Sequence, residues 1–124
     1  MEKKYRLRKN MEFKKVYNDG IKYWNRNFIL YIRKNNLDYS KVGFTVTKKH
    51  GNSVERNKIR RRMKEAYRHN SDSVKNGYDL VFIPKRGIIN IPYKELEDSM
   101  THIMRISKIV KIRWVYDQIR NLID

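Results

Sequence analysis

The sequence predicts a single α+β domain followed by a helical C-terminal extension. Two segments, residues 27–34 and 41–47, alternate apolar and polar side chains, which is typical of half-buried strands. Residues 54–68 repeat apolar side chains at helical spacing, and residues 78–83 form a short apolar run typical of a strand covered on both faces. Because a strand, a helix and a buried strand follow one another, we expect a βαβ unit with a parallel strand pair.

A short helix is the first element expected, after a basic arm of residues 1–9. Asn10 can cap this helix, and Glu12 lies in its first turn, where a negative charge is favourable. Gly20 can end the helix. Its apolar side consists of Phe13, Val16 and Tyr17.

Each of the two alternating segments has two distinct faces. One face of residues 27–34 carries Phe28, Leu30 and Ile32, and the other carries Ile29, Tyr31 and Arg33. One face of residues 41–47 carries Val42, Phe44 and Val46, and the other carries Gly43, Thr45 and Thr47. The turn-rich residues 35–40 make a hairpin the simple interpretation of these strands. Ile21 and Trp24 can add a short strand before them.

The helix expected at residues 54–68 separates an apolar side from a cationic side. Its core-facing side consists of Ile59, Met63, Ala66 and Tyr67. Its opposite side consists of Asn57, Arg61, Lys64 and Arg68, with Arg60 at the edge. Arginine holds five donors in a fixed plane that matches phosphate oxygens, and so many like charges on one helix repel one another. The helix therefore indicates a polyanionic partner.

A last helix is expected to begin at Pro92, after the turn at Asn76–Gly77 and the buried strand. Its apolar stripe consists of Leu96, Met100, Ile103 and Met104. The apolar spacing can continue as far as Ile119, so we expect residues 108–124 to form the helical extension.

The charge of the chain makes nucleic acid the leading candidate partner. Thirty Lys and Arg residues stand against thirteen acidic ones, which gives a net charge of +17 in 124 residues. An anionic membrane surface is the second candidate, but no apolar stretch approaches the roughly 20 residues of a spanning helix. The N-terminus lacks an apolar signal core, so we expect a cytoplasmic protein.

Other residue types narrow the class of protein further. The chain has no cysteine, which excludes disulfides, thiolate metal sites and a cysteine nucleophile. Its three histidines have no ligand spacing, so we expect no metal site on the protein. Nine tyrosines, four phenylalanines and two tryptophans are too many for a disordered basic tail. Some of these rings can serve as stacking platforms for bases.

Four segments together resemble a known family. Residues 10–17 read Asn-Met-Glu-Phe-Lys-Lys-Val-Tyr, and residues 42–61 read Val-Gly-Phe-Thr-Val-Thr-Lys-Lys-His-Gly-Asn-Ser-Val-Glu-Arg-Asn-Lys-Ile-Arg-Arg. Tyr78–Asp79 before the buried strand and Tyr93–Leu96 before the last helix extend the match to roughly residues 5–106. On these residues the chain is identified as a member of the family of protein subunits of bacterial ribonuclease P.

This resemblance implies a specific fold. The family has an αβββαβα two-layer sandwich with a mixed four-stranded sheet, like the second domain of ribosomal protein S5. Its parallel strands are joined by a left-handed crossover, whereas the general rule for such connections predicts a right-handed one. On this basis residues 1–107 form the family domain. Residues 108–124 form a C-terminal helical extension beyond the length at which the family generally ends.

The resemblance also implies an activity. The catalytic subunit of ribonuclease P is an RNA, which uses bound magnesium to cleave precursor tRNA and leave a mature 5′ end. The protein binds this RNA, contacts the 5′ leader of the precursor and strengthens magnesium-dependent cleavage. We expect a monomeric protein, one per catalytic RNA, that does not cleave alone. The magnesium is held mainly by RNA phosphates and water.

Two groups of residues acquire roles from the resemblance. Those expected to contact the catalytic RNA are Arg56, Asn57, Arg60, Arg61, Lys64, Lys48, Lys49, Arg8 and Lys9. Their cations and amide are phosphate and 2′-hydroxyl binders. The alternative is a solvated charged face, and Arg56 can instead be structural, since it projects near the apolar side of its helix. His50 stands where the family more often has an apolar residue.

The second group corresponds to the family's cleft for the single-stranded leader, between the first helix and one sheet face. It consists of Phe13, Tyr17, Ile29, Tyr31, Thr45 and Thr47. Tyr17 replaces a second Phe of the family and can still stack on a base, while Thr45 and Thr47 keep the hydroxyl of the more frequent Ser. The alternative is that Phe13 and Tyr31 belong to the core.

Three other functions are open at this point. A structural RNA-binding protein, such as a ribosomal protein, shares the charge and the βαβ core but gives no reason for an aromatic cleft. A DNA-binding module could use the cationic helix, but no second helix lies three or four residues away, as a helix-turn-helix needs. An independent protein nuclease would need clustered carboxylates for two metals, and the acidic residues are scattered.

Overall fold

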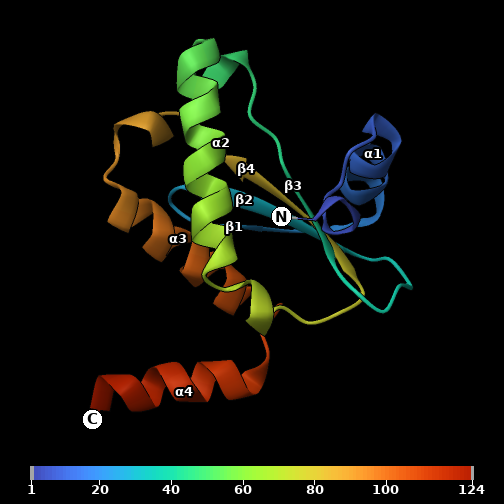
Figure 1. The fold of residues 1–124 in the computed structure, drawn as a ribbon, viewed down its shortest axis with the longest axis vertical. Coiled ribbons are helices and arrows are strands. Elements are labelled where there is room, and N and C mark those ends of the chain that lie inside the picture. The colour runs from blue at the N-terminus through green and yellow to red at the C-terminus, as the bar shows by residue number, and fades with distance from the viewer. Residues whose placement is uncertain (1, 124) are drawn as a thin grey trace.

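The computed structural model describes residues 2–123, apart from the side chains of residues 112–114 and 123. Its longer elements, in chain order, are α1 (Asn10–Asp19), β1 (Ile21–Trp24), β2 (Phe28–Lys34), β3 (Lys41–Phe44), α2 (Ser53–Arg68), β4 (Tyr78–Pro84), α3 (Tyr93–Ile106) and α4 (Ile112–Ile123) (Figure 1). Short 3-10 turns lie between them: η1 (Lys3–Tyr5), η2 (Lys48–His50), η3 (Ser71–Ser73) and η4 (Ile88–Asn90).

The four strands form one mixed sheet in the order β1-β2-β4-β3. β1 pairs with β2, and β2 with β4, in antiparallel fashion, whereas β3 and β4 are parallel. The short strand expected around Ile21 and Trp24 is confirmed. The hairpin predicted for residues 27–34 and 41–47 is wrong, because β4 lies between β2 and β3. The apolar strand β4 is best buried in the interior of the sheet. There both of its edges pair with other strands, and helices can cover both of its faces.

The predicted βαβ unit is confirmed as β3–α2–β4. Figure 1 shows α2 in front of the sheet, with β3 and β4 running toward the top of the view and β4 to the left of β3. The crossover is therefore left-handed, as the resemblance implied and against the general preference.

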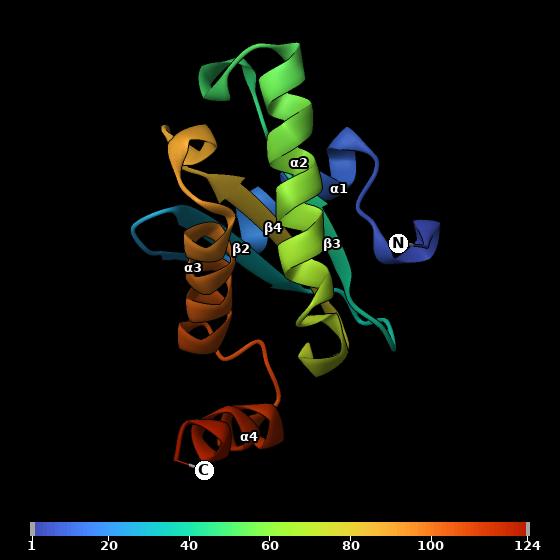
Figure 2. The same cartoon turned by 60° about the vertical axis from the view of Figure 1, so that its left-hand side comes forward.

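Helices cover both faces of the sheet. α2 and α3 pack side by side on one face, and α1 lies on the other (Figure 2). The larger core lies under α2 and α3 and includes Phe28, Leu30, Phe82, Met63 and Met100, all fully buried. A smaller cluster under α1 is built on Leu7, Val16 and Val81. The apolar stripes predicted for the helices at residues 54–68 and after Pro92 are buried as expected.

The start of α1 differs from the prediction that Asn10 caps it. Asn10 is the first helical residue, and the capping position belongs to Lys9. The carboxylate of Glu12 takes over the capping role, because its Oε1 accepts hydrogen bonds from the backbone N–H of Lys9 at 3.0 Å and of Arg8 at 3.2 Å. Its Oε2 lies 2.9 Å from Nζ of Lys41 on β3, so the same side chain fastens α1 to the sheet.

The C-terminal segment forms a helix of its own. α3 ends at Ile106, and Lys108, with φ of 62°, turns the chain away from the axis of α3. α4 then runs below the sheet in the view of Figure 1. Its Tyr116, Ile119 and Leu122 are exposed. No helix within the described residues has the length and apolar character needed to cross a membrane.

The Glu12 contact predicts a pH-dependent contribution to stability. Burial acts to raise the pKa of Glu12, but the hydrogen bonds from Lys41, Lys9 and Arg8 outweigh it and lower the pKa from 4.5 to about 2. A depressed folded-state pKa stabilises the protein above the unfolded-state value, and this stability is lost as the pH falls toward 2. We expect Glu12→Gln to lower the unfolding free energy at pH 7 by about 1–2 kcal/mol.

Urea unfolding at pH 7, 5 and 3 measures this effect. The difference between the native chain and Glu12→Gln should shrink below pH 4.5, the ordinary value for the carboxyl. Asp98→Asn is the matched control, because the Asp98–Lys94 pair is exposed and should contribute little. A Glu12→Gln deficit of constant size across this range would contradict the assignment.

Candidate nucleic-acid interface

Helix α2 begins at a complete capping box. The Asn52 side chain accepts a hydrogen bond from the N–H of Glu55, and the Glu55 carboxylate accepts one from the N–H of Asn52, both at 2.9 Å. This reciprocal pair satisfies two N–H groups that the helix itself leaves free. The start of α2 is therefore fixed directly after the loop that carries Lys48 and Lys49.

The cationic side of α2 is exposed, as the sequence predicts. We call Asn57, Arg61, Lys64 and Arg68 the basic face; all four are exposed, while Ile59, Met63, Ala66 and Tyr67 are buried on the other side of the helix. Among the described residues, neither Arg61 nor Lys64 forms an ion pair. Two full positive charges therefore project into solvent at adjacent turns of α2.

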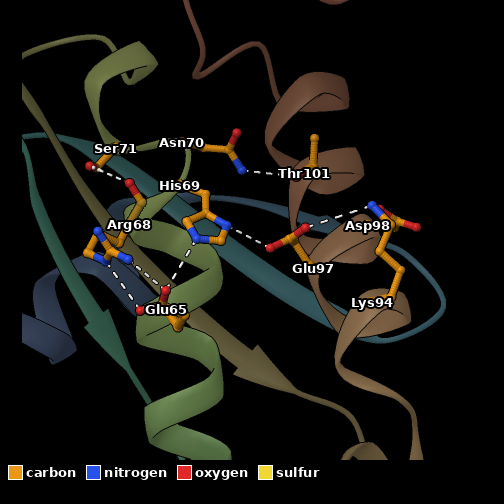
Figure 3. A network of polar contacts seen from close by, with 9 residues as sticks. All are labelled: Glu65, Arg68, His69, Asn70, Ser71, Lys94, Glu97, Asp98 and Thr101. Carbon is orange, nitrogen blue, oxygen red and sulfur yellow. Dashed lines mark hydrogen bonds and ion pairs between the residues drawn. The ribbon is translucent and has the colours of Figure 1, made fainter.

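The C-terminal end of the basic face is partly neutralised. Arg68 donates from Nη2 and Nε to the Glu65 carboxylate at 2.7 and 3.2 Å, and this contact lowers the pKa of Glu65. His69 lies between Glu65, at 3.2 Å, and Glu97 of α3, at 2.7 Å (Figure 3). Asn70 adds a hydrogen bond to Thr101 of α3 at 2.9 Å. These contacts tie the end of α2 to α3, and they leave Arg61 and Lys64 as the cations of this face without an ion pair among the described residues.

Two further arginines hold the loop between β3 and α2. Arg60 donates from Nη2 to the Val46 carbonyl at 3.0 Å, and Arg56 donates from Nη1 to the Gly51 carbonyl at 3.1 Å. The structural alternative for Arg56 is thus supported, and Arg60 shares it. Both side chains are partly buried, so their charge lies close to the loop backbone rather than at the outer surface.

His50 is a loop residue that sequence reasoning noted but did not explain. Its Nδ1 accepts a hydrogen bond from the N–H of Thr47 at 2.9 Å, and its Nε2 lies 2.6 Å from the Pro84 carbonyl at the end of β4. An apolar side chain could make neither contact. The ring therefore fastens η2, with the exposed Lys48 and Lys49, to the central strand of the sheet.

Five of the six residues predicted to form the leader cleft, all except Thr47, lie on the α1 side of the sheet. Tyr17 Oη lies 2.6 Å from Thr45 Oγ1, and the Tyr17 and Tyr31 rings meet edge to face with centroids 5.3 Å apart. Burial raises the pKa of Tyr17, so this hydroxyl stays protonated at neutral pH. Phe13 lies directly over Gly43, where a Cβ atom would be 2.5 Å from its ring. Only glycine at that position lets Phe13 lie so close to the strand.

The α1 side of the sheet continues beyond these contacts as a row of half-covered side chains. Ile29 pairs with Ile83 of β4, and both are half-buried. The N–H of Thr45 donates to the Phe82 carbonyl at 2.9 Å, which places Thr45 beside Ile83. We call the side of the sheet with Tyr31, Ile29, Ile83 and Thr45 the open face.

Three predicted residues are placed differently from the rest. Thr47 is exposed, and its Oγ1 accepts a hydrogen bond from the N–H of Lys49 at 3.4 Å, so it caps η2. Arg8 and Lys9 are exposed, and their backbone N–H groups bind Glu12. Both residues lie at the start of α1 rather than on α2.

The basic face and the open face lie on opposite sides of the sheet (Figures 1 and 2). The segment that joins them is residues 45–52, which leaves β3 beside the open face and enters α2. Lys48 and Lys49 lie within this segment. Within the described residues, no group of His, Asp and Glu side chains is arranged to hold a metal ion.

Comparison with known proteins is consistent with this geometry. Residues 1–108 match the family model described as Ribonuclease P. The chain is 42% identical over 110 residues to the ribonuclease P protein component of Alkaliphilus metalliredigens, covering 89% of this chain and 99% of the relative. It is 44% identical over 107 residues to the same component of Clostridium novyi, covering 85% and 95%.

Solved structures give the same result. The ribonuclease P protein of Staphylococcus aureus superposes with a TM-score of 0.80 at 30% identity, covering 86% of this chain and 98% of that one. The protein of Thermotoga maritima superposes with a TM-score of 0.74 at 28% identity, covering 81% and 96%. The family model ends at residue 108, so α4 lies beyond the matched residues.

Two neighbouring arginines of α2 should differ in their effect on folding. Arg60→Ala removes the bond to the Val46 carbonyl and should lower the unfolding free energy by about 1 kcal/mol. Arg61→Ala removes an exposed side chain and should change it by less than about 0.5 kcal/mol. Urea denaturation of both variants measures the difference, and equal losses would contradict the placement of Arg60 as a loop clamp.

Proposed function

The chain belongs to the family of bacterial ribonuclease P protein components, and from this premise we propose that it assists an RNA catalyst in removing the 5′ leader of precursor tRNA. In this proposal the RNA subunit performs the cleavage and the protein does not cleave alone. The protein contributes binding energy and position, which lower the barrier by holding the scissile bond where the RNA can act.

The basic face is the surface we assign to the catalytic RNA. Arg61 and Lys64 project side by side from α2 without ion pairs among the described residues, and Asn57 can both donate and accept hydrogen bonds. Phosphate oxygens and 2′-hydroxyl groups of a folded RNA offer the matching partners. Lys48 and Lys49, on the loop held by His50, extend this contact toward the other side of the sheet.

The open face is the surface we assign to the leader. Tyr31 and Tyr17 present aromatic rings and Ile29 an apolar floor, while the Thr45 hydroxyl adds a polar group. Unpaired bases stack on such rings with little sequence preference, which suits a leader whose sequence varies among precursors. A double-stranded RNA would offer no free bases to these rings.

The observation that carries the proposal is the separation of the two surfaces by one sheet. A protein with the basic face alone could be any RNA-binding protein. A second surface of aromatic and apolar side chains, on the opposite side and joined to the first by Lys48 and Lys49, lets one chain hold a folded RNA and a single strand together.

The remaining components follow from this role. We propose a cytoplasmic assembly with one protein per catalytic RNA. Magnesium in this assembly is held mainly by RNA phosphates and water, since that ion keeps several waters and readily binds phosphate oxygens. The cations of the protein reduce the repulsion between the precursor and the catalytic RNA, and this lowers the magnesium concentration that cleavage needs.

A salt titration tests the basic face. Arg61→Ala should weaken binding of the catalytic RNA and reduce the slope of log affinity against log salt by about one unit, because each lost phosphate contact releases one counterion less. Lys94→Ala is the control, since Lys94 lies on α3 and pairs with Asp98 at 3.1 Å. An unchanged slope for Arg61→Ala in filter binding would remove Arg61 from the interface.

Leader dependence tests the open face. Tyr31→Ala should weaken binding of a precursor with a leader by about 1–3 kcal/mol and leave the affinity for mature tRNA unchanged. Tyr31→Phe keeps the ring and should retain most of the affinity. If Tyr31→Ala weakened both RNAs equally, Tyr31 would be a core residue or a contact to the tRNA body.

A further inference from the structure

Strand β1 carries a large aromatic side chain that the structure leaves uncovered. Trp24, at the end of β1, is 64% exposed. β1 is an edge strand whose only sheet neighbour among the described residues is β2. Its neighbour Tyr23 faces the opposite way and packs against the main core under α3. Trp24 therefore contributes little to the core of the domain.

The strand register places Trp24 on the open face. Trp24 pairs with Ile29 of β2, and Ile29 pairs with Ile83 of β4. Residues paired directly across antiparallel strands point to the same side of a sheet. Thr45, which directly follows β3 and lies beside Ile83, completes a row of four residues that begins at β1 and crosses β2 and β4. Trp24 is the outer end of this row, about 5 Å from Ile29 along the sheet.

A cation accompanies this tryptophan on the same side. Lys22 pairs with Tyr31, which pairs in turn with Val81 under α1. Lys22 therefore lies beside Tyr31, and Trp24 lies beside Ile29. Tyr31 and Ile29 are the two residues of β2 that we assign to the leader. The side chains of Lys22 and Trp24 are both exposed, so a ligand can reach them.

We propose that Trp24 and Lys22 bind one further nucleotide of the single-stranded leader, beyond those held at Tyr31 and Ile29. The Trp24 ring stacks on the base, and the Lys22 ammonium contacts a phosphate of the same strand. This inference rests on the proposed function of the open face. Single-stranded RNA is the occupant because Trp24 and Lys22 adjoin the open face, they combine an exposed ring with a cation, and the chain carries a net charge of +17.

Leader length is the variable that tests this site. Precursors with leaders of one to eight nucleotides are bound to the complex of protein and catalytic RNA. With the native chain, the affinity for the precursor should increase with leader length until it reaches a plateau. With Trp24→Ala, the plateau should begin at a leader one nucleotide shorter. With long leaders Trp24→Ala should bind about five-fold or more weakly, and with the shortest leaders it should match the native chain.

Conservative variants of Trp24 distinguish stacking of its ring on a base from a contact that needs only an apolar side chain. Trp24→Phe keeps a ring and should retain most of the affinity for long leaders, whereas Trp24→Leu keeps apolar area and should lose it. In a Trp114→Phe background Trp24 is the sole tryptophan, and its fluorescence should be quenched by the long-leader precursor but not by the shortest one. Trp24→Ala should unfold at the same urea concentration as the native chain, since its ring is exposed.

Several outcomes would overturn the proposal. A loss of affinity that is the same at every leader length would place Trp24 outside the leader path, and so would no loss at all. Concentration-dependent self-association that Trp24→Ala abolishes would assign the ring to a second copy of the chain. Tyr31→Ala is measured in parallel: if it alone weakens leader binding, the proposed function stands and the Trp24 site fails. If Tyr31→Ala also has no effect, the leader role of the open face fails.

Discussion

The burial of β4 on both faces is the constraint on which the rest of the structure depends. Leu80 and Phe82 face the core under α2 and α3, and Val81 faces the cluster under α1; all three are fully buried. An apolar strand of this kind requires helices on both sides of the sheet and a paired strand on each edge. The same requirement places α2 and α1 on opposite sides of the sheet, which both helices stabilise. The basic face and the open face therefore lie on opposite sides of this sheet.

The loop between β3 and α2 connects these two surfaces, and it is held from several directions. Arg60 and Arg56 bind its carbonyls, His50 joins it to Pro84, and the box between Asn52 and Glu55 fixes where the helix begins. Each contact ends on the backbone, so the loop path does not depend on an RNA ligand. The positions of the two lysines between the surfaces are therefore set by the fold itself. In the function we propose, this reduces the entropy lost when RNA binds.

Local patterns in the sequence predicted the local structure well. The helical period of residues 54–68 gave the buried and exposed sides of α2, and the alternation of residues 27–34 gave the two faces of β2. Strand pairing was not predictable in the same way, because the neighbour of β2 is decided by the burial of β4. Arg33 of β2 and its partner Asp79 of β4 are 46 residues apart in the sequence. The left-handed crossover came only from the resemblance to a family.

Single side chains were harder to place than segments. Glu12 rather than Asn10 binds the N–H groups at the start of α1, and the same carboxylate contacts Lys41, a residue distant in sequence. Thr47 left the predicted face because it is the residue before η2, and its side chain caps that turn. The alternation around Trp24 indicates only that Lys22 and Trp24 share one face of a short strand. The register with β2 places Trp24 on the side of Ile29, and the pattern of one strand does not reveal that register.

The central claim is that this chain supports a catalytic RNA, and 5′ processing of a precursor tRNA tests it most directly. The purified chain, a bacterial ribonuclease P RNA and the mixture of the two are compared at low magnesium and moderate salt. The account predicts a mature 5′ end from the mixture, with little from the RNA alone and none from the protein alone. No gain over the RNA alone, with the chain folded and bound to RNA, would contradict it and leave a structural RNA-binding protein.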